Sequence, residues 1–146
     1  MFNWTKSKGF ERSYPFMGAA LVSGCWWWFC VKFPEPADSM LNASLTFGAI
    51  ITGFLGTSKA ILMSLKGTKI FRRLYDSGFI NDLSGYLQAA ILSSLGFCLL
   101  SFAGFFKLGA NQYFGVAWSF FGAHTVLSFW RIMAVLLAIL KLDTRK

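Results

Sequence analysis

Four long apolar stretches alternate with short polar segments along the chain. Each stretch approaches or exceeds the ~18 apolar residues that cross a bilayer core as a helix. Prolines in FPEPADS end the first stretch, and the glycine-containing segment KLGANQ separates the last two. The pattern predicts four transmembrane helices, over about residues 14–33, 40–60, 83–106 and 113–133.

The second apolar stretch continues into a basic segment, FLGTSKAILMSLKGTKIFRRL over residues 54–74, with no proline or turn cluster between them. Beyond Ala60, apolar and basic residues alternate roughly at helical spacing, which is typical of an amphipathic helix. We therefore predict that the second and fourth helices extend into the cytoplasm, over about residues 61–76 and 134–142. The apolar side of the first extension needs a partner: the second extension, another subunit or the headgroup layer.

Composition supports this interpretation. Of the 146 residues, 55% are hydrophobic and only 14% are charged, and the mean hydropathy is +0.54. A soluble domain of this length carries more charge, and no polar run is long enough to form a separate one. We predict an all-α integral membrane protein in which residues 1–146 form a single four-helix transmembrane domain.

The basic residues predict the orientation of these helices, because cytoplasmic loops carry an excess of lysine and arginine. Lys32 and Lys107 fall on one side of the predicted membrane, together with Glu35 and Asp38. The other side carries most of the positive charge: Lys6, Lys8, Arg12, Lys66, Lys69, Arg72, Arg73, Lys141, Arg145 and Lys146. We therefore expect both termini to be cytoplasmic.

Two cations are predicted to lie at the same depth. Lys59 is 17 residues after Asn42, and Arg131 is 18 residues after Tyr113. At ~1.5 Å per residue these spacings span roughly 26–27 Å, close to the thickness of the hydrocarbon core. We expect Lys59 and Arg131 to form a charge belt at the inner interface, with the membrane boundary near Lys59.

The extension of the second helix carries a basic collar made of Lys66, Lys69, Arg72 and Arg73. Three partners fit this charge: membrane lipid phosphates, a cytosolic sensor protein, or a nucleotide or oligonucleotide. Charge alone does not choose among them.

Small residues recur at a spacing of four within the spans, the pattern by which membrane helices pack closely. The predicted packing positions are Gly48, Thr52, Gly53, Gly56, Gly115, Ser119 and Ala123. The two rows on the second helix cover a broad arc, so one can pack within the protomer and the other against a second subunit. So small a chain does not easily enclose a cavity, and we expect a homo-oligomer, with a tetramer as the working assumption.

His124 is the one ionisable residue well inside the predicted spans. It is either a structural side chain bonded to a neighbouring hydroxyl or an intramembrane gating site. A proton relay normally needs a second titratable group, and no span contains Asp or Glu. With one histidine, no thiol pair and no metal-ligand spacing, we expect neither an enzyme nor a metal or other cofactor.

A local order of segments follows the second span: the basic KGTKIFRRL, then DSGF, then INDLSGYLQAAIL, a polar start to the third span. In this order, in size and in its expected topology the chain resembles the small four-span effectors of bacterial phage-exclusion systems, of the RexB-like or Hailong type. The resemblance implies an effector of the bacterial inner membrane that assembles into an ion-conducting oligomer. In that family a cytosolic partner signals infection, or an oligonucleotide ligand does so in the Hailong type, and the channel depolarises the cell.

The leading hypothesis is therefore a homo-oligomeric gated channel or pore, and the resemblance implies that it serves anti-phage defence. The alternative is a non-conducting membrane anchor or accessory subunit that docks a cytosolic partner through its basic collar. The two differ in whether the assembled protein conducts ions.

Overall fold

A computed structural model describes residues 8–29, 33, 36–64, 79–106 and 112–143. Within these residues the chain is α-helical, with no strand. The helices are α1 (Lys8–Trp28), α2 (Ala37–Ser64), α4 (Phe79–Gly104) and α5 (Gln112–Asp143). The predicted all-α class is thus confirmed.

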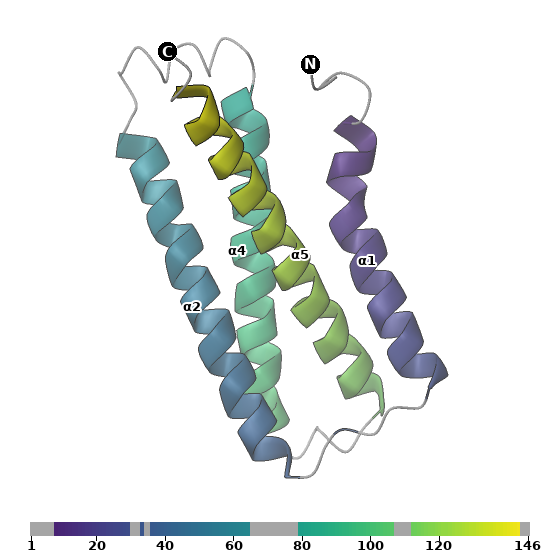
Figure 1. Cartoon of the computed structure of the whole chain (residues 1–146). Helices are drawn as coiled ribbons and strands as arrows, with labels where there is room; N and C mark the ends of the chain where they lie inside the picture. Colours follow the sequence, from purple (N-terminus) through teal and green to yellow (C-terminus); the bar gives the residue numbers. More distant parts are fainter. Residues whose placement is uncertain (1–7, 30–32, 34–35, 65–78, 107–111, 144–146) are drawn as a thin grey trace.

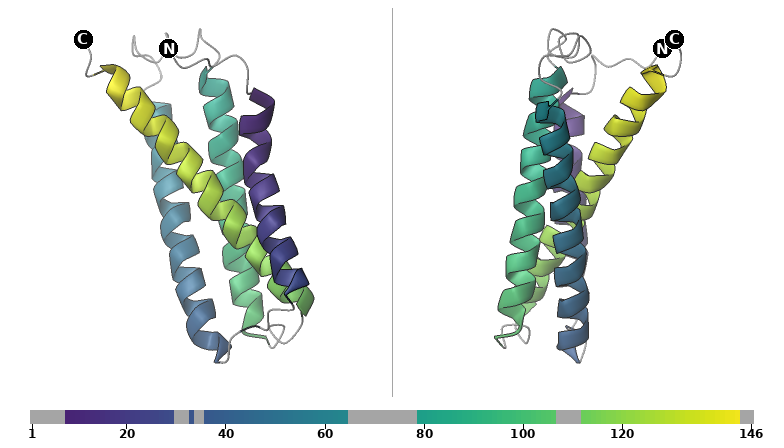
Figure 2. Two further views of the ribbon diagram at one scale, coloured as in Figure 1. Left: turned by 45° about the vertical axis from the view of Figure 1, so that its right-hand side comes forward. Right: turned by 90° about the vertical axis from the view of Figure 1, so that its left-hand side faces the viewer.

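The four helices run alternately up and down, so that the start of α1 and the end of α5 lie at the same end of the bundle (Figure 1). α5 is the central element: it packs on both α1 and α4, while α2 packs mainly on α4. α5 also leans away from α2 and α4 toward its C-terminal end (Figure 2). Because α1 packs on α5 and makes no comparable contact with α2 or α4, it is attached to the bundle chiefly through α5.

Three of the helical segments are long and apolar enough to cross a membrane: Ala37–Ser64, Leu83–Gly104 and Gln112–Leu137. This is the pattern of a multi-pass membrane protein. The remaining helix, α1, carries Glu11 and Arg12 near its start. Its role as a fourth span, and the side on which the termini lie, stay predictions.

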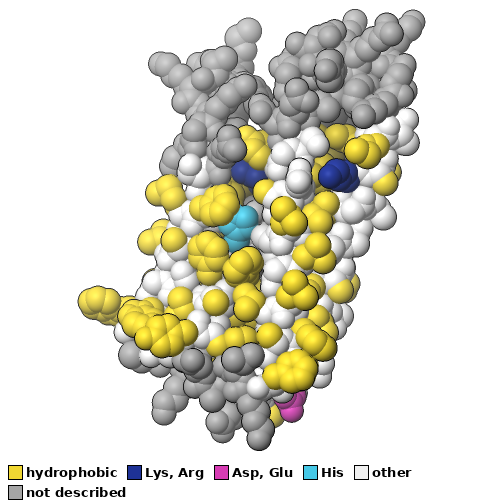
Figure 3. Space-filling model, turned by 180° about the vertical axis from the view of Figure 1, so that it is seen from behind, with side chains coloured by type: hydrophobic (Ala, Val, Ile, Leu, Met, Phe, Trp, Pro, Cys, Tyr) yellow, Lys and Arg dark blue, Asp and Glu magenta, His cyan; other side chains and the backbone are white. Residues whose placement is uncertain are grey.

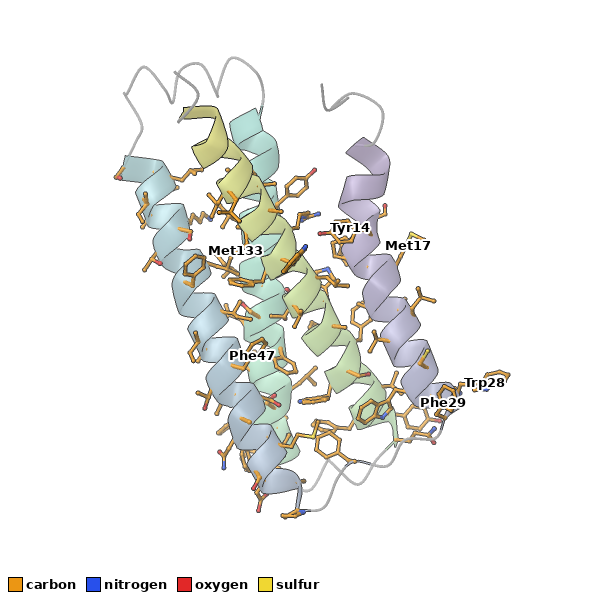
Figure 4. The ribbon with its side chains drawn as sticks, in the orientation of Figure 1. Tyr14, Met17, Trp28, Phe29, Phe47 and Met133 are labelled. Atoms are coloured by element: carbon orange, nitrogen blue, oxygen red, sulfur yellow. The ribbon has the colours of Figure 1, made fainter. Side chains whose placement is uncertain are left out.

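The bounds of α1 differ from the predicted ones. We expected a helix from Tyr14 to Phe33, because proline favours the first helical position and Pro15 follows a serine closely. Instead α1 begins at Lys8 and ends at Trp28, so that Pro15 lies inside it and is fully buried. Eight residues into a helix, proline removes a single backbone hydrogen bond. At the end of α1, Trp28 and Phe29 point away from the bundle (Figure 4).

The interior has two apolar clusters. One lies toward the end of α2 and the start of α4, and consists of Ile51, Leu55, Leu83, Leu87, Ala90 and Ile132. The other lies toward the opposite end, and consists of Leu41, Phe97, Phe114 and Trp118. Between them on α4 and α5 come buried polar residues instead: Ser93, Ser94, His124, Thr125 and Ser128. The bundle therefore has a polar middle, although many large apolar side chains are exposed on its outside, as on the face in Figure 3.

Candidate functional site

A polar stripe runs along the buried side of α5. His124, Ser128 and Arg131 follow one another at spacings of four and three, so they lie on one face of the helix. All three are buried. Buried polar side chains are costly inside a membrane protein, which makes this stripe the first candidate for a functional site.

His124 is only 5% exposed and sits among aromatic rings. The ring of Phe16, from α1, lies 4.3 Å away between centroids, and the ring of Phe120 stacks at 6.2 Å. Its Nδ1 is 3.5 Å from the Ser128 hydroxyl, at the outer limit of a hydrogen bond, and its Nε2 has no hydrogen-bond partner in the structure. The imidazole thus has one weakly bonded nitrogen and one buried nitrogen without a hydrogen-bond partner.

Arg131 lies two turns further along α5 and is 9% exposed. Its guanidinium carbon is 3.8 Å from the ring centroid of Tyr86 on α4, a cation–π contact. On the other side of α5, the hydroxyl of Tyr14 donates to the backbone oxygen of Leu127 at 3.3 Å. Tyr14 and Tyr86 therefore flank this end of the stripe from α1 and α4.

Figure 3 shows the histidine and two cationic side chains from behind the bundle. Lys59 and Arg131 are the cations whose side chains the structure describes. Lys59 is half-buried on α2. The predicted charge belt of Lys59 and Arg131 stays a prediction.

A hydroxyl pair joins α2 to α4. The Thr52 and Ser94 hydroxyl oxygens are 2.8 Å apart, and Ser94 is fully buried. Each hydroxyl oxygen also lies near a carbonyl oxygen of its own helix, that of Gly48 at 2.8 Å and that of Ile91 at 3.0 Å. Because a hydroxyl has one proton, one of the two donates to its carbonyl while the other donates across to it. One turn away, Cys98 Sγ approaches the backbone oxygen of Leu45 at 3.8 Å.

We expect Thr52 and Ser94 to be energetically coupled. Thr52→Val and Ser94→Ala should each destabilise the fold, and the double variant by less than the sum, with a coupling of about 0.6 kcal/mol, the average for such membrane hydrogen bonds. Unfolding in mixed detergent micelles, followed by circular dichroism, measures it. Thr57→Val is the control, because the Thr57 hydroxyl donates to Phe54 of its own helix. Additive effects of the pair would contradict the prediction.

The predicted packing positions separate into packed and open ones. A Cβ atom added to Gly48 would lie 2.6 Å from Cys98 Sγ, and one added to Gly115 would lie 2.6 Å from Trp26 Nε1, so both glycines allow close helix contact. By contrast, nothing lies within 4 Å of a Cβ added to Gly53 or Gly56. On α5, Ser119 is buried and Ala123 half-buried.

The open positions on α2 belong to a larger feature. At 100° per residue, an arc of about 100° on this helix carries small or polar residues and no bulky apolar one. We call it the small-residue arc; its members, all exposed, are Asp38, Ser39, Asn42, Thr46, Ala49, Gly53, Gly56, Thr57, Ala60 and Ser64. The neighbouring exposed arc carries Phe47, Ile50, Phe54 and Ile61. The helix therefore has three faces: a buried one toward α4, a bulky apolar one, and the small-residue arc.

The basic collar, Lys66, Lys69, Arg72 and Arg73, lies outside the described residues, as does most of the predicted extension over 61–76. α5 continues as a helix to Asp143, through the predicted extension over 134–142. In the described part of the chain no group of three His, Cys, Asp or Glu side chains is placed to hold a metal ion.

Sequence reasoning singled out His124 and Arg131 but missed the residues that surround them. Ser128 was recognisable, because a spacing of four from His124 places it on the same face of α5. Tyr86 and Phe16 carried no such signal, since they come from other helices. No protein-family model, curated protein or solved structure matched the chain in the comparisons made. The resemblance to phage-exclusion effectors stays a prediction.

Proposed function

We propose that this multi-pass membrane protein is a homo-oligomeric effector that forms a gated ion channel. The observation that carries the proposal is the small-residue arc of α2, which is exposed along the whole helix. A chain of 146 residues does not easily enclose a conduit by itself, so conduction calls for several copies.

The small-residue arc suits an assembly better than it suits lipid. Membrane helices associate by van der Waals contact, and small residues let their backbones approach closely. Asn42, Thr46 and Thr57 also offer polar atoms along the arc, as the lining of an ion pathway requires. The adjacent bulky arc, with Phe47, Ile50 and Phe54, faces lipid in this arrangement.

The rest of the proposal rests on the resemblance to phage-exclusion effectors. Inner-membrane localisation, gating by a cytosolic sensor or oligonucleotide at the basic collar, and depolarisation of an infected cell are what the resemblance implies. A tetramer arranged with four copies of α2 nearest the axis is the working assembly. The alternative is a non-conducting anchor that uses the same collar to hold a cytosolic protein.

Purified protein tests the proposal directly. Native mass spectrometry in detergent should show an oligomer, and vesicles containing it should leak ions under an applied potential, read by a potential-sensitive dye. Empty vesicles are the control. A monomer contradicts the proposal, and so does an oligomer whose vesicles stay as tight as empty ones at both signs of potential. The second outcome favours the anchor.

A further inference from the structure

Amphipathic aromatic side chains gather on the outside of the bundle where α1 ends and α5 begins. The rings of Trp27 and Tyr113 lie 5.5 Å apart between centroids, and the next residue, Trp28, is 82% exposed. Gln112 Nε2 also lies 3.5 Å from the backbone oxygen of Trp27, so the end of α1 and the start of α5 are at one level. We call Trp27, Trp28 and Tyr113, all exposed, the first girdle.

A second group of such side chains lies toward the other end of the bundle. Trp130 is 72% exposed on α5, and the neighbouring Arg131 holds its guanidinium carbon 3.8 Å from the ring centroid of Tyr86 on α4. One turn earlier on α5, the backbone oxygen of Leu127 accepts a hydrogen bond from the hydroxyl of Tyr14 on α1. Tyr14, Tyr86 and Trp130, from three helices, form the second girdle.

The two girdles are about one membrane thickness apart. Along α5, Trp130 is 17 residues after Tyr113, which at ~1.5 Å per residue is roughly 26 Å, near the ~30 Å of a hydrocarbon core. Along α1, Trp28 is 14 residues after Tyr14, which is roughly 21 Å. The long side chains of these two residues, which Figure 4 shows toward opposite ends of α1, can reach further toward the headgroups.

Between the girdles, the large exposed side chains are mostly apolar. They include Phe16, Met17, Leu21 and Val22 on α1, Leu92, Leu95 and Leu99 on α4, and Val126 on α5. Of the tryptophans and tyrosines whose side chains the structure describes, Trp118 lies between the two levels. It is buried, and its Nε1 donates to Ser101 Oγ at 3.2 Å. Apolar side chains in the middle with tryptophan and tyrosine at both ends are typical of a surface that spans a bilayer.

α1 lies alongside α5 over the whole distance between the girdles. Near the first girdle, the rings of Trp26 and Trp118 lie 6.1 Å apart between centroids. Toward the second girdle, the ring of Phe16 lies 4.3 Å from that of His124. This part of α5 belongs to the segment Gln112–Leu137, which is long and apolar enough to cross a membrane. A helix that contacts such a segment at both levels and between them shares its membrane.

We propose that the two girdles lie in the two headgroup layers of a phospholipid bilayer, and that α1 is a fourth membrane-spanning helix. Indole and phenol rings suit this layer, because each has an apolar body and a polar group that stays wet. No charged residue lies between Tyr14 and Trp28. The charged residues of α1 all precede Tyr14: Lys8, Glu11 and Arg12. The proposal rests on the multi-pass membrane assignment, but on neither assembly nor conduction.

Quenching of tryptophan fluorescence by brominated lipids tests the depth of each girdle. Every variant also carries Trp4→Phe, so that the emission of Trp4 does not contribute. Trp130→Phe leaves the first girdle as the exposed emitter, and Trp27→Phe with Trp28→Phe leaves the second. In phosphatidylcholine vesicles, bromines near the top of the acyl chain should quench both variants more strongly than bromines near its methyl end. Any other order, for either girdle, overturns the proposal.

Leu21→Trp tests the placement of α1. Leu21 is 70% exposed and lies halfway between Tyr14 and Trp28. In a variant whose exposed tryptophans are all phenylalanine, the new tryptophan should be quenched more strongly by the deep bromines than by the shallow ones. The same variant with Leu21 unchanged is the control, because it gives the emission of Trp26 and Trp118. All the replaced side chains are exposed, and circular dichroism checks that each variant is helical.

Leu95→Trp in the same background separates two kinds of failure. Leu95 is exposed on α4, within the candidate span Leu83–Gly104, and its replacement should behave like Leu21→Trp. If Leu21→Trp escapes quenching and Leu95→Trp does not, α1 lies outside the bilayer and the proposal is overturned, while α4 still spans. If both escape quenching, the multi-pass membrane assignment fails as well.

Discussion

Replacing Gly53 by leucine is expected to weaken assembly while leaving the protomer folded. Gly53 lies in the middle of the small-residue arc, and nothing in the protomer lies within 4 Å of an added Cβ. Leucine there meets no neighbour in its own chain, but it holds apart any helix that packs on the arc. We expect the dissociation constant of the oligomer to rise about 5- to 150-fold, since overpacking costs about 1–3 kcal/mol. Ion flux should fall with it.

Ala43→Leu is the matched control for this variant. Ala43 is also exposed on α2, but it lies on the bulky apolar arc with Phe47 and Ile50. The same small-to-large change should therefore leave both assembly and flux intact. Native mass spectrometry and vesicle flux measure the two variants side by side. If Ala43→Leu loses the oligomer and Gly53→Leu keeps it, the interface lies on the bulky apolar arc and the proposed interface is wrong.

The helices were largely predictable because long apolar runs leave few alternatives. The last helix was expected from Tyr113 to Leu142 and runs over Gln112–Asp143, since polar residues bound it on both sides. The start of α1 was not predictable in the same way. A proline at the first helical position and a proline eight residues into a helix look alike in sequence, and only the packing of Pro15 on its neighbours distinguishes them.

The candidate site was predictable only within single helices. The spacing of His124 and Arg131 fixes their common face, because helical geometry is local. Their surroundings depend on how α1 and α4 are rotated and tilted against α5, and the sequence of one helix does not contain that information. The two rows of small residues on α2 are a second example of a feature whose surroundings the sequence does not contain. The sequence marks both rows, but only the structure places Gly48 against α4 and leaves Gly53 open.

Gly48→Ala is expected to destabilise the folded protomer, whereas Gly53→Leu weakens assembly. The reason is that Gly48 packs against α4 inside the protomer. The added Cβ would lie 2.6 Å from Cys98 Sγ and 3.3 Å from Phe97 Cδ1, with the backbone oxygen of Ser94 at 3.6 Å. A side chain can move from such a contact, but the α4 backbone behind it limits how far α2 can shift. We expect a loss of about 1–3 kcal/mol of unfolding free energy, although alanine favours a helix by about 1 kcal/mol.

Gly85→Ala separates packing from helix propensity. Gly85 lies within α4, and nothing lies within 4 Å of its added Cβ, so alanine there should stabilise the protein by roughly 0.5–1 kcal/mol. Adding Cys98→Ala to Gly48→Ala should recover part of the loss, because it removes the sulfur that the new Cβ meets. Unfolding curves in mixed micelles compare all three variants. If Gly48→Ala stabilises the protein as Gly85→Ala does, α2 and α4 are not held at the close distance that the Thr52–Ser94 bond also requires.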